Sequence, residues 1–248
     1  MSDSNVQTRP LNVVITGASR GIGKAIAQKF AAQGHHLYIC SRNEATLQQT
    51  VQELIGTYPG IKVKAKVRDL SKRSDVENFG QWLLDNGMPI DVLINNAGCF
   101  VPGSVYNEPE GALEQMLAVN LFSAYHLTRK VVPLMLKQSA LHGSRGHIIN
   151  ICSIASLQAY ANGGSYSISK HALLGFSRNL REELKPHLIK VTAVFPGAVL
   201  TDSWGGFDNS QRRIMEASDI AELVYAATRL SPQACVEDIV VRPQLGDL

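Results

Sequence analysis

The pattern of hydrophobic and polar positions predicts strands that alternate with helices along the whole chain. Short runs of β-branched and other apolar residues recur, and each is followed by a longer stretch whose apolar residues have helical spacing. The runs predict seven strands, at residues 11–16, 37–41, 62–67, 92–95, 147–152, 191–195 and 239–242. The stretches between them predict helices at residues 23–33, 44–56, 74–86, 109–139, 165–185 and 218–230.

This alternation predicts the fold class. Strands that are connected through helices pair in parallel, and the helices then cover both faces of the sheet. No repeat, linker or low-complexity segment divides the 248 residues. The sequence therefore predicts an α/β fold: a single doubly wound domain over residues 1–248, with a seven-stranded, mainly parallel sheet and helices on both faces. Ligands bind beyond the carboxyl ends of such strands, which directs attention to the loops at 17–23, 95–104 and 196–210.

Composition and charge exclude several classes of protein. Hydrophobic residues make up 45% of the chain and charged residues 18%, which supports a packed core and excludes a disordered chain. The net charge of +3 is spread without a basic block, so no nucleic-acid partner is expected. No apolar run reaches the roughly 18 to 20 residues of a membrane helix, and no signal peptide is recognisable, so we expect no membrane association and a cytoplasmic location. The four cysteines lack metal-ligand spacing, which predicts free thiols and no metal site.

A glycine-rich segment joins the first predicted strand to the first predicted helix. Its glycines, Gly17, Gly21 and Gly23, allow a tight turn and a close approach of backbone N–H groups to a pyrophosphate at the positive end of the helix. The candidate phosphate-binding residues are Gly17, Ser19, Arg20, Gly21, Ile22 and Gly23. The spacing is Gly-x3-Gly-x-Gly and not the common Gly-x-Gly-x-x-Gly. The alternative, a turn without a ligand, stays open on this motif alone.

The end of the second predicted strand indicates which dinucleotide would bind. In nicotinamide dinucleotide folds, an acidic residue at this point bonds the ribose 2′-hydroxyl of NAD. Here the strand ends in Ser41 and Arg42, and no acid is present. Arg42 can pair with a 2′-phosphate, and Arg20 can approach it from the glycine loop. The sequence therefore predicts NADP(H) as the cofactor, with two solvated arginines as the alternative.

A tyrosine and a lysine at helical spacing form the candidate reaction centre. Tyr166 and Lys170 lie on one face of the predicted helix 165–185, and Ser153 follows a predicted strand upstream. A free tyrosine has a pKa near 10, and a nearby ammonium group would lower it toward neutral pH. A second Tyr-x3-Lys pair at 58 and 62 is interrupted by Pro59 and Gly60, which break the helix that would align it.

With these motifs the chain resembles the short-chain dehydrogenase/reductase family over essentially its whole length. The matching segments are Thr16–Gly23, Asp69-Leu70, Asn95–Gly98, Asn120, Ser153, Tyr166-x3-Lys170, and Pro196-Gly197 with Thr201. The resemblance implies a Rossmann-type domain and an NADP-dependent oxidoreductase that reduces a ketone or aldehyde to an alcohol by hydride transfer.

The resemblance also implies roles for individual residues. Tyr166 would donate a proton to the substrate carbonyl, and Ser153 would hydrogen-bond the same oxygen. Lys170 would hold the nicotinamide ribose and lower the pKa of Tyr166, and Asn120 would hold a proton-relaying water. The remaining cofactor contacts would be Asp69, Leu70, Asn96, Ala97, Gly98, Pro196, Gly197, Val199 and Thr201. Asn96 and Asn120 as backbone caps, and Asp69 as a turn residue, stay open as alternatives.

The substrate side is expected in a lid at about residues 197–215. Trp204 and Phe207 would form its apolar roof, with Tyr160, Phe100 and Val101 as candidates for the opposite wall. The end of the chain resembles sepiapterin-reductase-like and carbonyl-reductase members, and the first half resembles 3-oxoacyl-carrier-protein reductases. A small-molecule carbonyl substrate is therefore favoured. The alternatives are a 3-oxoacyl thioester and, in another class, a non-catalytic NADP-sensing protein.

The predicted helix 165–185 also bears on oligomeric state. Apolar residues surround much of it: Ala172, Leu173, Leu174, Phe176, Leu180 and Leu184. Part of this surface is expected to pack on a second subunit, as in the family's homodimers and homotetramers. Burial within one subunit is the alternative.

Overall fold

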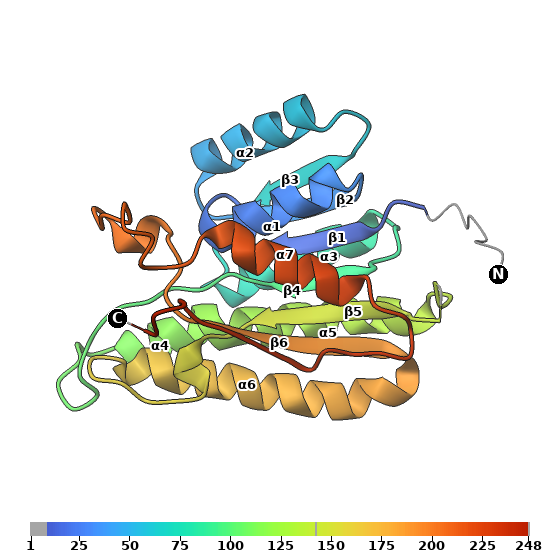
Figure 1. Ribbon diagram of the computed structural model, residues 1–248. Coiled ribbons are helices and arrows are strands. Elements are labelled where there is room, and N and C mark those ends of the chain that lie inside the picture. The colour runs from blue at the N-terminus through green and yellow to red at the C-terminus, as the bar shows by residue number, and fades with distance from the viewer. Residues whose placement is uncertain (1–8, 142, 248) are drawn as a thin grey trace.

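The structure, a computed structural model, describes residues 9–141 and 143–247 and contains one seven-stranded sheet (Figure 1). The strand order is β3-β2-β1-β4-β5-β6-β7, and every neighbouring pair is parallel. The strands are β1 (Asn12–Thr16), β2 (His36–Ser41), β3 (Val63–Val67), β4 (Val92–Asn95), β5 (Gly146–Ile151), β6 (Ile189–Pro196) and β7 (Asp238–Val241). The predicted fold class is confirmed, because all seven expected strands are present.

Helices connect the strands. They are α1 (Gly21–Ala32), α2 (Glu44–Thr57), α3 (Arg73–Asp85), α4 (Ala112–Leu117), α5 (Ser123–Lys137), α6 (Gly164–Leu184) and α7 (Ala217–Thr228). Short turns of other helix types are η1 (Ala118–Phe122), η2 (Ile154–Ser156), η3 (Lys185–His187) and η4 (Asp202–Trp204). In the part of the chain that the structure describes, no helix has the length and apolar character needed to span a membrane.

Apolar clusters fill the space between the sheet and its helices, and the two larger ones lie on opposite faces of the sheet. Successive residues of a strand point to opposite faces, so Val13 and Ile15 of β1 join one cluster and Val14 joins the other. The first cluster holds the buried sides of α1, α2 and α7, and the second those of α3, α5 and α6. Figure 1 shows α1 and α7 side by side on one face, with α6 along the other. The sheet is therefore covered on both sides.

The helix predicted at 109–139 is interrupted in the structure. Gly111 has a φ of +83°, and α4 begins after it. The π-helical turn η1, with Asn120 at its centre, then separates α4 from α5. Such turns insert one extra residue into a helix and are frequent at functional sites. Apolar periodicity predicts the helical character of this stretch but not the break, because the residues of a π turn keep helical dihedral angles.

The strand order places two loops next to each other. The chain moves outward from β1 to β2 and β3, then returns to pair β4 with the other side of β1. The loops after β1 and β4 therefore leave the carboxyl edge of the sheet in opposite directions, which opens a crevice between them. The predicted glycine loop and the Asn95–Gly98 segment border this crevice.

Candidate active site

The glycine loop is folded tightly against its neighbours. Gly17 and Gly21 have positive φ angles of 66° and 52°, which favour glycine. A Cβ on Gly23 would overlap the Gly17 carbonyl oxygen and the Asn96 side chain, so this position requires glycine too. The hydroxyl groups of Ser19 and Ser41 lie 2.7 Å apart and connect the loop to the end of β2. The loop therefore has a defined shape before any ligand contributes.

The N-terminus of α1 behind this loop has no side-chain cap. Its N-cap residue, Arg20, makes no capping hydrogen bond, and the first turn contains no acidic residue. The first bond within the helix runs from the Lys24 amide to the Arg20 carbonyl oxygen, at 3.2 Å. The amides of Gly21, Ile22 and Gly23 precede that bond and lack partners within the helix. Uncapped amides and an unneutralised helix dipole fit a bound diphosphate.

Asn96 holds the two loops of the crevice together. Its side-chain amide donates to the carbonyl oxygens of Thr16 and Gly17, at 2.9 and 3.1 Å. In return, the Thr16 hydroxyl oxygen accepts from the amides of Asn96 and Ala97, at 3.0 and 2.9 Å. These bonds agree with the reading of Asn96 as a backbone cap, and they hold the loop after β4 against the loop after β1.

Asp69 and Leu70 lie at the end of β3, on the side expected for an adenine ring. Leu70 is buried, and the Asp69 carboxylate accepts from the Ser71 amide and hydroxyl, at 3.2 and 2.8 Å. Burial acts to raise the pKa of Asp69, but the Ser71 hydrogen bonds and the charges of Lys72 and Arg42 hold it below its ordinary value. Asp69 is thus a turn residue, and the exposed Arg42 is close enough for its charge to act on it.

Ser153, Tyr166 and Lys170 come together at the carboxyl edge of β5. Ser153 is the N-cap of η2, where its hydroxyl oxygen accepts from the Ala155 amide at 3.2 Å. Tyr166 and Lys170 lie one turn apart on α6, with Lys170 Nζ 5.8 Å from the centre of the tyrosine ring. Lys170 is buried, and its ammonium group donates to the Ile151 carbonyl oxygen at 2.8 Å.

The pKa of Tyr166 is raised in this structure, whereas the sequence predicts that a nearby ammonium group lowers it. Its hydroxyl group is surrounded by protein, although the ring keeps some exposure, and this burial raises the pKa above the ordinary value of 10.0. Hydrogen bonding with the Ser153 side chain lowers the pKa but does not outweigh burial. Burial also lowers the pKa of Lys170. Burial therefore dominates the Tyr166 pKa in this structure, and the Lys170 ammonium group donates to the Ile151 carbonyl oxygen.

Asn120 is buried within the π turn and contacts both loop and helix. Its side chain accepts from the Cys99 amide at 2.8 Å and donates to the Cys99 carbonyl oxygen at 3.0 Å. A Cβ on Gly98 would lie 3.2 Å from Asn120 Oδ1 and 3.6 Å from Lys170 Nζ. Asn120 and Lys170 therefore both lie close to Gly98.

Ser169 is hydrogen-bonded to Asn120 and to the backbone of Tyr166, and the sequence motifs do not identify it. Its hydroxyl group donates to the Tyr166 carbonyl oxygen at 2.7 Å and accepts from the Asn120 side chain at 2.9 Å. The only signal in the sequence is its position three residues after Tyr166 on a helix, where a buried serine has no local partner other than the backbone. The network links the π turn to the first turns of α6.

The segment after β6 crosses the mouth of the crevice. The Gly197 amide donates to the Val241 carbonyl oxygen at 2.8 Å, and the buried Val199 pairs with Met215 in a parallel bridge. A Cβ on Gly21 would lie 3.1 Å from the Thr201 side chain, so Thr201 lies against the start of α1. Thr201 is thus placed beside the glycine loop.

The aromatic candidates divide into two groups. Trp204 and Phe207 pack edge to face on each other, with ring centres 5.3 Å apart. Phe100 packs against the ring of Tyr166, with centres 4.9 Å apart, and is 46% exposed. Burial and the nearby Tyr166 charge raise the pKa of Tyr160 to about 12. Phe100 and Tyr160 therefore lie beside Tyr166, whereas the rings of Trp204 and Phe207 contact each other.

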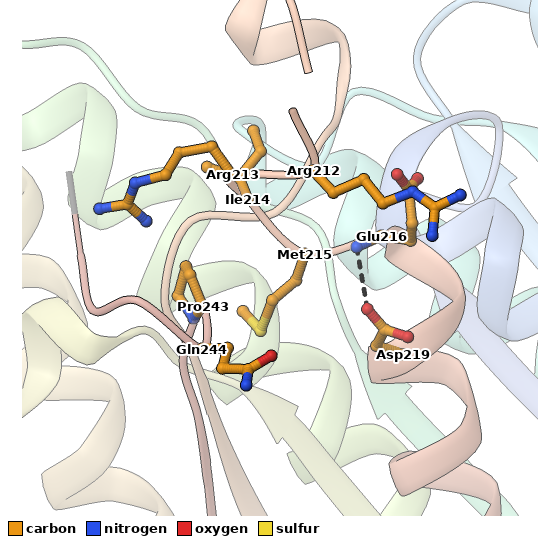
Figure 2. Close-up of a pocket in the computed structure, with 8 residues that line it drawn as sticks. All are labelled: Arg212, Arg213, Ile214, Met215, Glu216, Asp219, Pro243 and Gln244. Carbon is orange, nitrogen blue, oxygen red and sulfur yellow. Dashed lines mark hydrogen bonds between the residues drawn. The ribbon is translucent and has the colours of Figure 1, made fainter. Parts of the chain in front are cut away.

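Two surface hollows lie elsewhere. One, of about 420 Å³, lies between the end of the lid and the C-terminal segment (Figure 2). It is lined by Arg212, Arg213, Ile214, Met215, Glu216, Asp219, Pro243 and Gln244. The other, of about 510 Å³, is lined by Arg73, Glu77, His126, Arg129 and Lys130 of α3 and α5. Neither hollow is lined by Ser153, Tyr166 or Lys170. No group of three or more potential metal ligands occurs within residues 9–141 and 143–247.

Comparison with known sequences decides the family. The model of the short chain dehydrogenase family matches residues 11–212. The chain belongs to this family. Among curated relatives, this dehydrogenase is 32% identical over 244 residues to a sepiapterin reductase of Chlorobaculum tepidum, covering 95% of this chain and 97% of the relative. It is 30% identical over 213 residues to a diacetyl reductase of Staphylococcus epidermidis, covering 86% and 80%.

Solved structures resemble this short-chain dehydrogenase along almost its whole length. An alcohol dehydrogenase from Thermococcus sibiricus, complexed with 5-hydroxy-NADP, has a TM-score of 0.85 at 27% identity and covers 95% of this chain and 97% of its own. A metagenomic short-chain oxidoreductase in complex with NADP has a TM-score of 0.79 at 31% identity and covers 94% and 97%. Both relatives carry the kind of cofactor that Arg42 and the missing acid predict for this chain.

Proposed function

We propose that this short-chain dehydrogenase is an NADP-dependent reductase that converts the carbonyl group of a small ketone or aldehyde into an alcohol. One observation carries the proposal: a buried lysine and a tyrosine one turn apart on α6, with a serine from the end of β5 as hydrogen-bond partner of the tyrosine. This arrangement places a proton donor and a second hydrogen-bond donor around one reacting oxygen.

The residues along the crevice suit NADP(H). The open N-terminus of α1 and the glycine loop would hold the diphosphate, Arg42 with Arg20 the 2′-phosphate, and Asp69 with Leu70 the adenine side. Gly98 and the Pro196–Thr201 stretch would border the nicotinamide end. The reduced nicotinamide, when bound, supplies the hydride.

The protein's own residues would then handle the proton. The Tyr166 hydroxyl group donates its proton to the carbonyl oxygen as negative charge develops there, and the Ser153 hydroxyl group hydrogen-bonds that oxygen. Burial keeps Tyr166 protonated at neutral pH, which suits an acid in the reductive direction. Lys170 would hold the ribose hydroxyl groups, and a water beside Gly98, between Lys170 and Asn120, would return a proton from solvent.

The substrate is proposed to be a small carbonyl compound. The names of two relatives, a sepiapterin reductase and a diacetyl reductase, support this class. Phe100 and Tyr160 offer an aromatic wall beside Tyr166, and the lid at 197–215 would bring Trp204 and Phe207 over the site. Gly206, with a φ of +81°, is the hinge candidate in this lid.

A homodimer or homotetramer is proposed on the family resemblance. Leu173, Leu174, Leu180 and Leu184 of α6 are buried within the chain itself, so they leave little apolar surface for a partner. Phe122 and Ile168, 47% and 42% exposed, are the apolar residues of η1 and α6 that remain available.

The test is NADPH oxidation against a vicinal diketone, an aromatic aldehyde, sepiapterin and an acetoacetyl thioester, with NADH in parallel. We expect turnover with NADPH of one of the first three substrates. Turnover of the thioester alone would replace the small-carbonyl proposal with the acyl-thioester alternative. Tight NADPH binding with no turnover of any carbonyl would favour the NADP-sensing alternative.

Tyr166→Phe tests the proton donor. It removes the hydroxyl group and keeps the ring, so turnover should fall by about a thousandfold while NADPH affinity stays within a few fold. Tyr106→Phe is the matched control, because Tyr106 is 86% exposed in the loop after β4. A Tyr166→Phe enzyme as active as the control would disprove the assigned role.

A further inference from the structure

The helix that carries Tyr166 and Lys170 begins without a cap from its own segment. The N-cap residue of α6 is Gly163, which has no side chain, and the first turn contains no acidic residue. The first amides of a helix need acceptors from outside the helix. The acceptor for this end therefore has to come from another part of the chain.

Glu108, in the loop between β4 and α4, supplies it. Its Oε1 accepts from the Ser165 amide at 2.8 Å across 57 residues of sequence, and its Oε2 accepts from the Ser165 hydroxyl group. Ser165 is 2% exposed and immediately precedes Tyr166. A carboxylate at a helix N-terminus forms charge-assisted bonds and complements the helix dipole. The carboxylate thus binds the residue next to the candidate proton donor.

Two glycines give the carboxylate its path. A Cβ on Gly164 would overlap Glu108 Oε1, and a Cβ on Gly103 would lie 2.6 Å from Glu108 Cγ. Gly103 is also bonded to the segment before α6, since its amide donates to the Asn162 carbonyl oxygen at 3.1 Å. The missing side chains of Gly103 and Gly164 therefore allow the loop and the N-terminus of α6 to approach each other closely.

The same loop contacts the reaction centre at its other end. Cys99 is held through both backbone polar groups by Asn120, and Phe100 packs on the ring of Tyr166. The segment from Cys99 to Glu108 is thus attached to the catalytic elements at both ends. A shift of Glu108 would be transmitted to the turn of α6 that carries Tyr166.

We propose that Glu108 is a positioning residue: by capping α6 through Ser165 it fixes the first turn of the helix and holds the Tyr166 hydroxyl group at the reacting oxygen. This inference rests on the proposed function, because it assigns Glu108 a part in proton donation by Tyr166. Misplacement of a reacting group by about 1 Å is enough to lower the rate by about a hundredfold. Loss of a cap one residue from Tyr166 is therefore expected to lower the rate.

The test compares Glu108→Ala and Glu108→Gln, with Glu110→Ala as control. Glu110 is an exposed acid of the same loop. With NADPH and butane-2,3-dione, we expect Glu108→Ala to lower kcat by about tenfold to a hundredfold while the NADPH dissociation constant changes less than about twofold. Glu108→Gln retains an acceptor for the Ser165 amide and should restore kcat to within about threefold of the wild type. Equal kcat for Glu108→Ala and Glu110→Ala would overturn the proposal.

Amide hydrogen exchange provides a readout that does not depend on turnover. The Ser165 amide should exchange faster in Glu108→Ala than in the wild type, and at the wild-type rate in Glu108→Gln and Glu110→Ala. Unchanged Ser165 protection in Glu108→Ala would overturn the cap itself. If the wild type turns over none of the carbonyl probes, the proposed function fails, and this measurement still decides whether Glu108 holds the helix end.

Discussion

The N-termini of α1 and α6 lie at the same edge of the sheet, but their first backbone amides differ in whether a side chain accepts hydrogen bonds from them. The α1 end has no side-chain cap, no acid in its first turn, and a glycine loop in front of it. The α6 end has no cap of its own either, yet the Glu108 carboxylate from a distant loop accepts from its Ser165 amide. The positive end of the helix dipole is thus without a negative partner in α1 and is paired with a carboxylate in α6.

The difference follows from what each helix has to do. A helix end that binds a phosphate must leave its amides free, because a resident carboxylate would compete for them and repel the ligand. A helix that carries reacting side chains must hold them still, and a charge-assisted cap removes motion from the first turn. The capping pattern therefore agrees with the proposed roles, which are phosphate binding for α1 and positioning of the reacting side chains for α6.

Placing an acid at the α1 end should break the contrast and produce the largest effect. Arg20 has extended N-cap geometry, with φ −160° and ψ 172°, so Arg20→Asp can cap the helix. NADPH affinity should fall by about a hundredfold, because the new carboxylate would repel the negatively charged diphosphate by a few kcal/mol. The free energy of unfolding of the ligand-free protein should rise by about 1 kcal/mol.

Arg20→Ala is the control for the lost positive charge. Fluorescence titration with NADPH and denaturant unfolding measure the two effects on both variants. Arg20→Asp that binds NADPH as tightly as Arg20→Ala would mean that the diphosphate does not lie at this helix end.

Removing the charge beside the open end should have a smaller and selective effect. Arg42→Ala should weaken NADPH by about 30-fold through loss of a charge-assisted pair with the 2′-phosphate, and NADH by less than about threefold. Lys72→Ala serves as a matched control, since Lys72 is exposed and its charge also acts on Asp69. Titration of both cofactors measures the ratio. Equal losses for NADPH and NADH would remove the 2′-phosphate assignment.

The smallest expected change concerns the ionisation of the Tyr166 hydroxyl group on α6. Burial raises the pKa of Tyr166 above 10.0, so the neutral phenol is the favoured form in the folded protein. In the ligand-free protein, the tyrosinate absorbance of wild type minus Tyr166→Phe should therefore stay near zero up to about pH 10. The same titration with saturating NADP⁺ measures any lowering by Lys170 once its ammonium group engages a ligand. Ionisation of Tyr166 near neutral pH in the ligand-free protein would contradict the effect of burial.

Much of the fold and part of the site follow from local sequence. All seven strands lie within two residues of their predicted bounds, because apolar runs between turn residues mark buried strands. Tyr166 and Lys170 share a helix face through their spacing alone. Apolar periodicity predicts the long helix around Asn120 but not its π turn. The spacing of Tyr166 and Lys170 carries no information about the burial that raises the tyrosine pKa.

Local sequence is enough to predict the alternation of strands and helices, the tight turn of the first loop and the shared helix face of Tyr166 and Lys170. Each of these depends on residues only a few positions apart, whose periodicity or turn preference is local. Three contacts emerge from the folded chain alone: Ser153 with Tyr166, Asn120 with Ser169 across 49 residues, and Glu108 with the start of α6 across 57. Those contacts depend on strand order and loop paths, which bring distant residues to one edge of the sheet and leave no periodic trace along the chain.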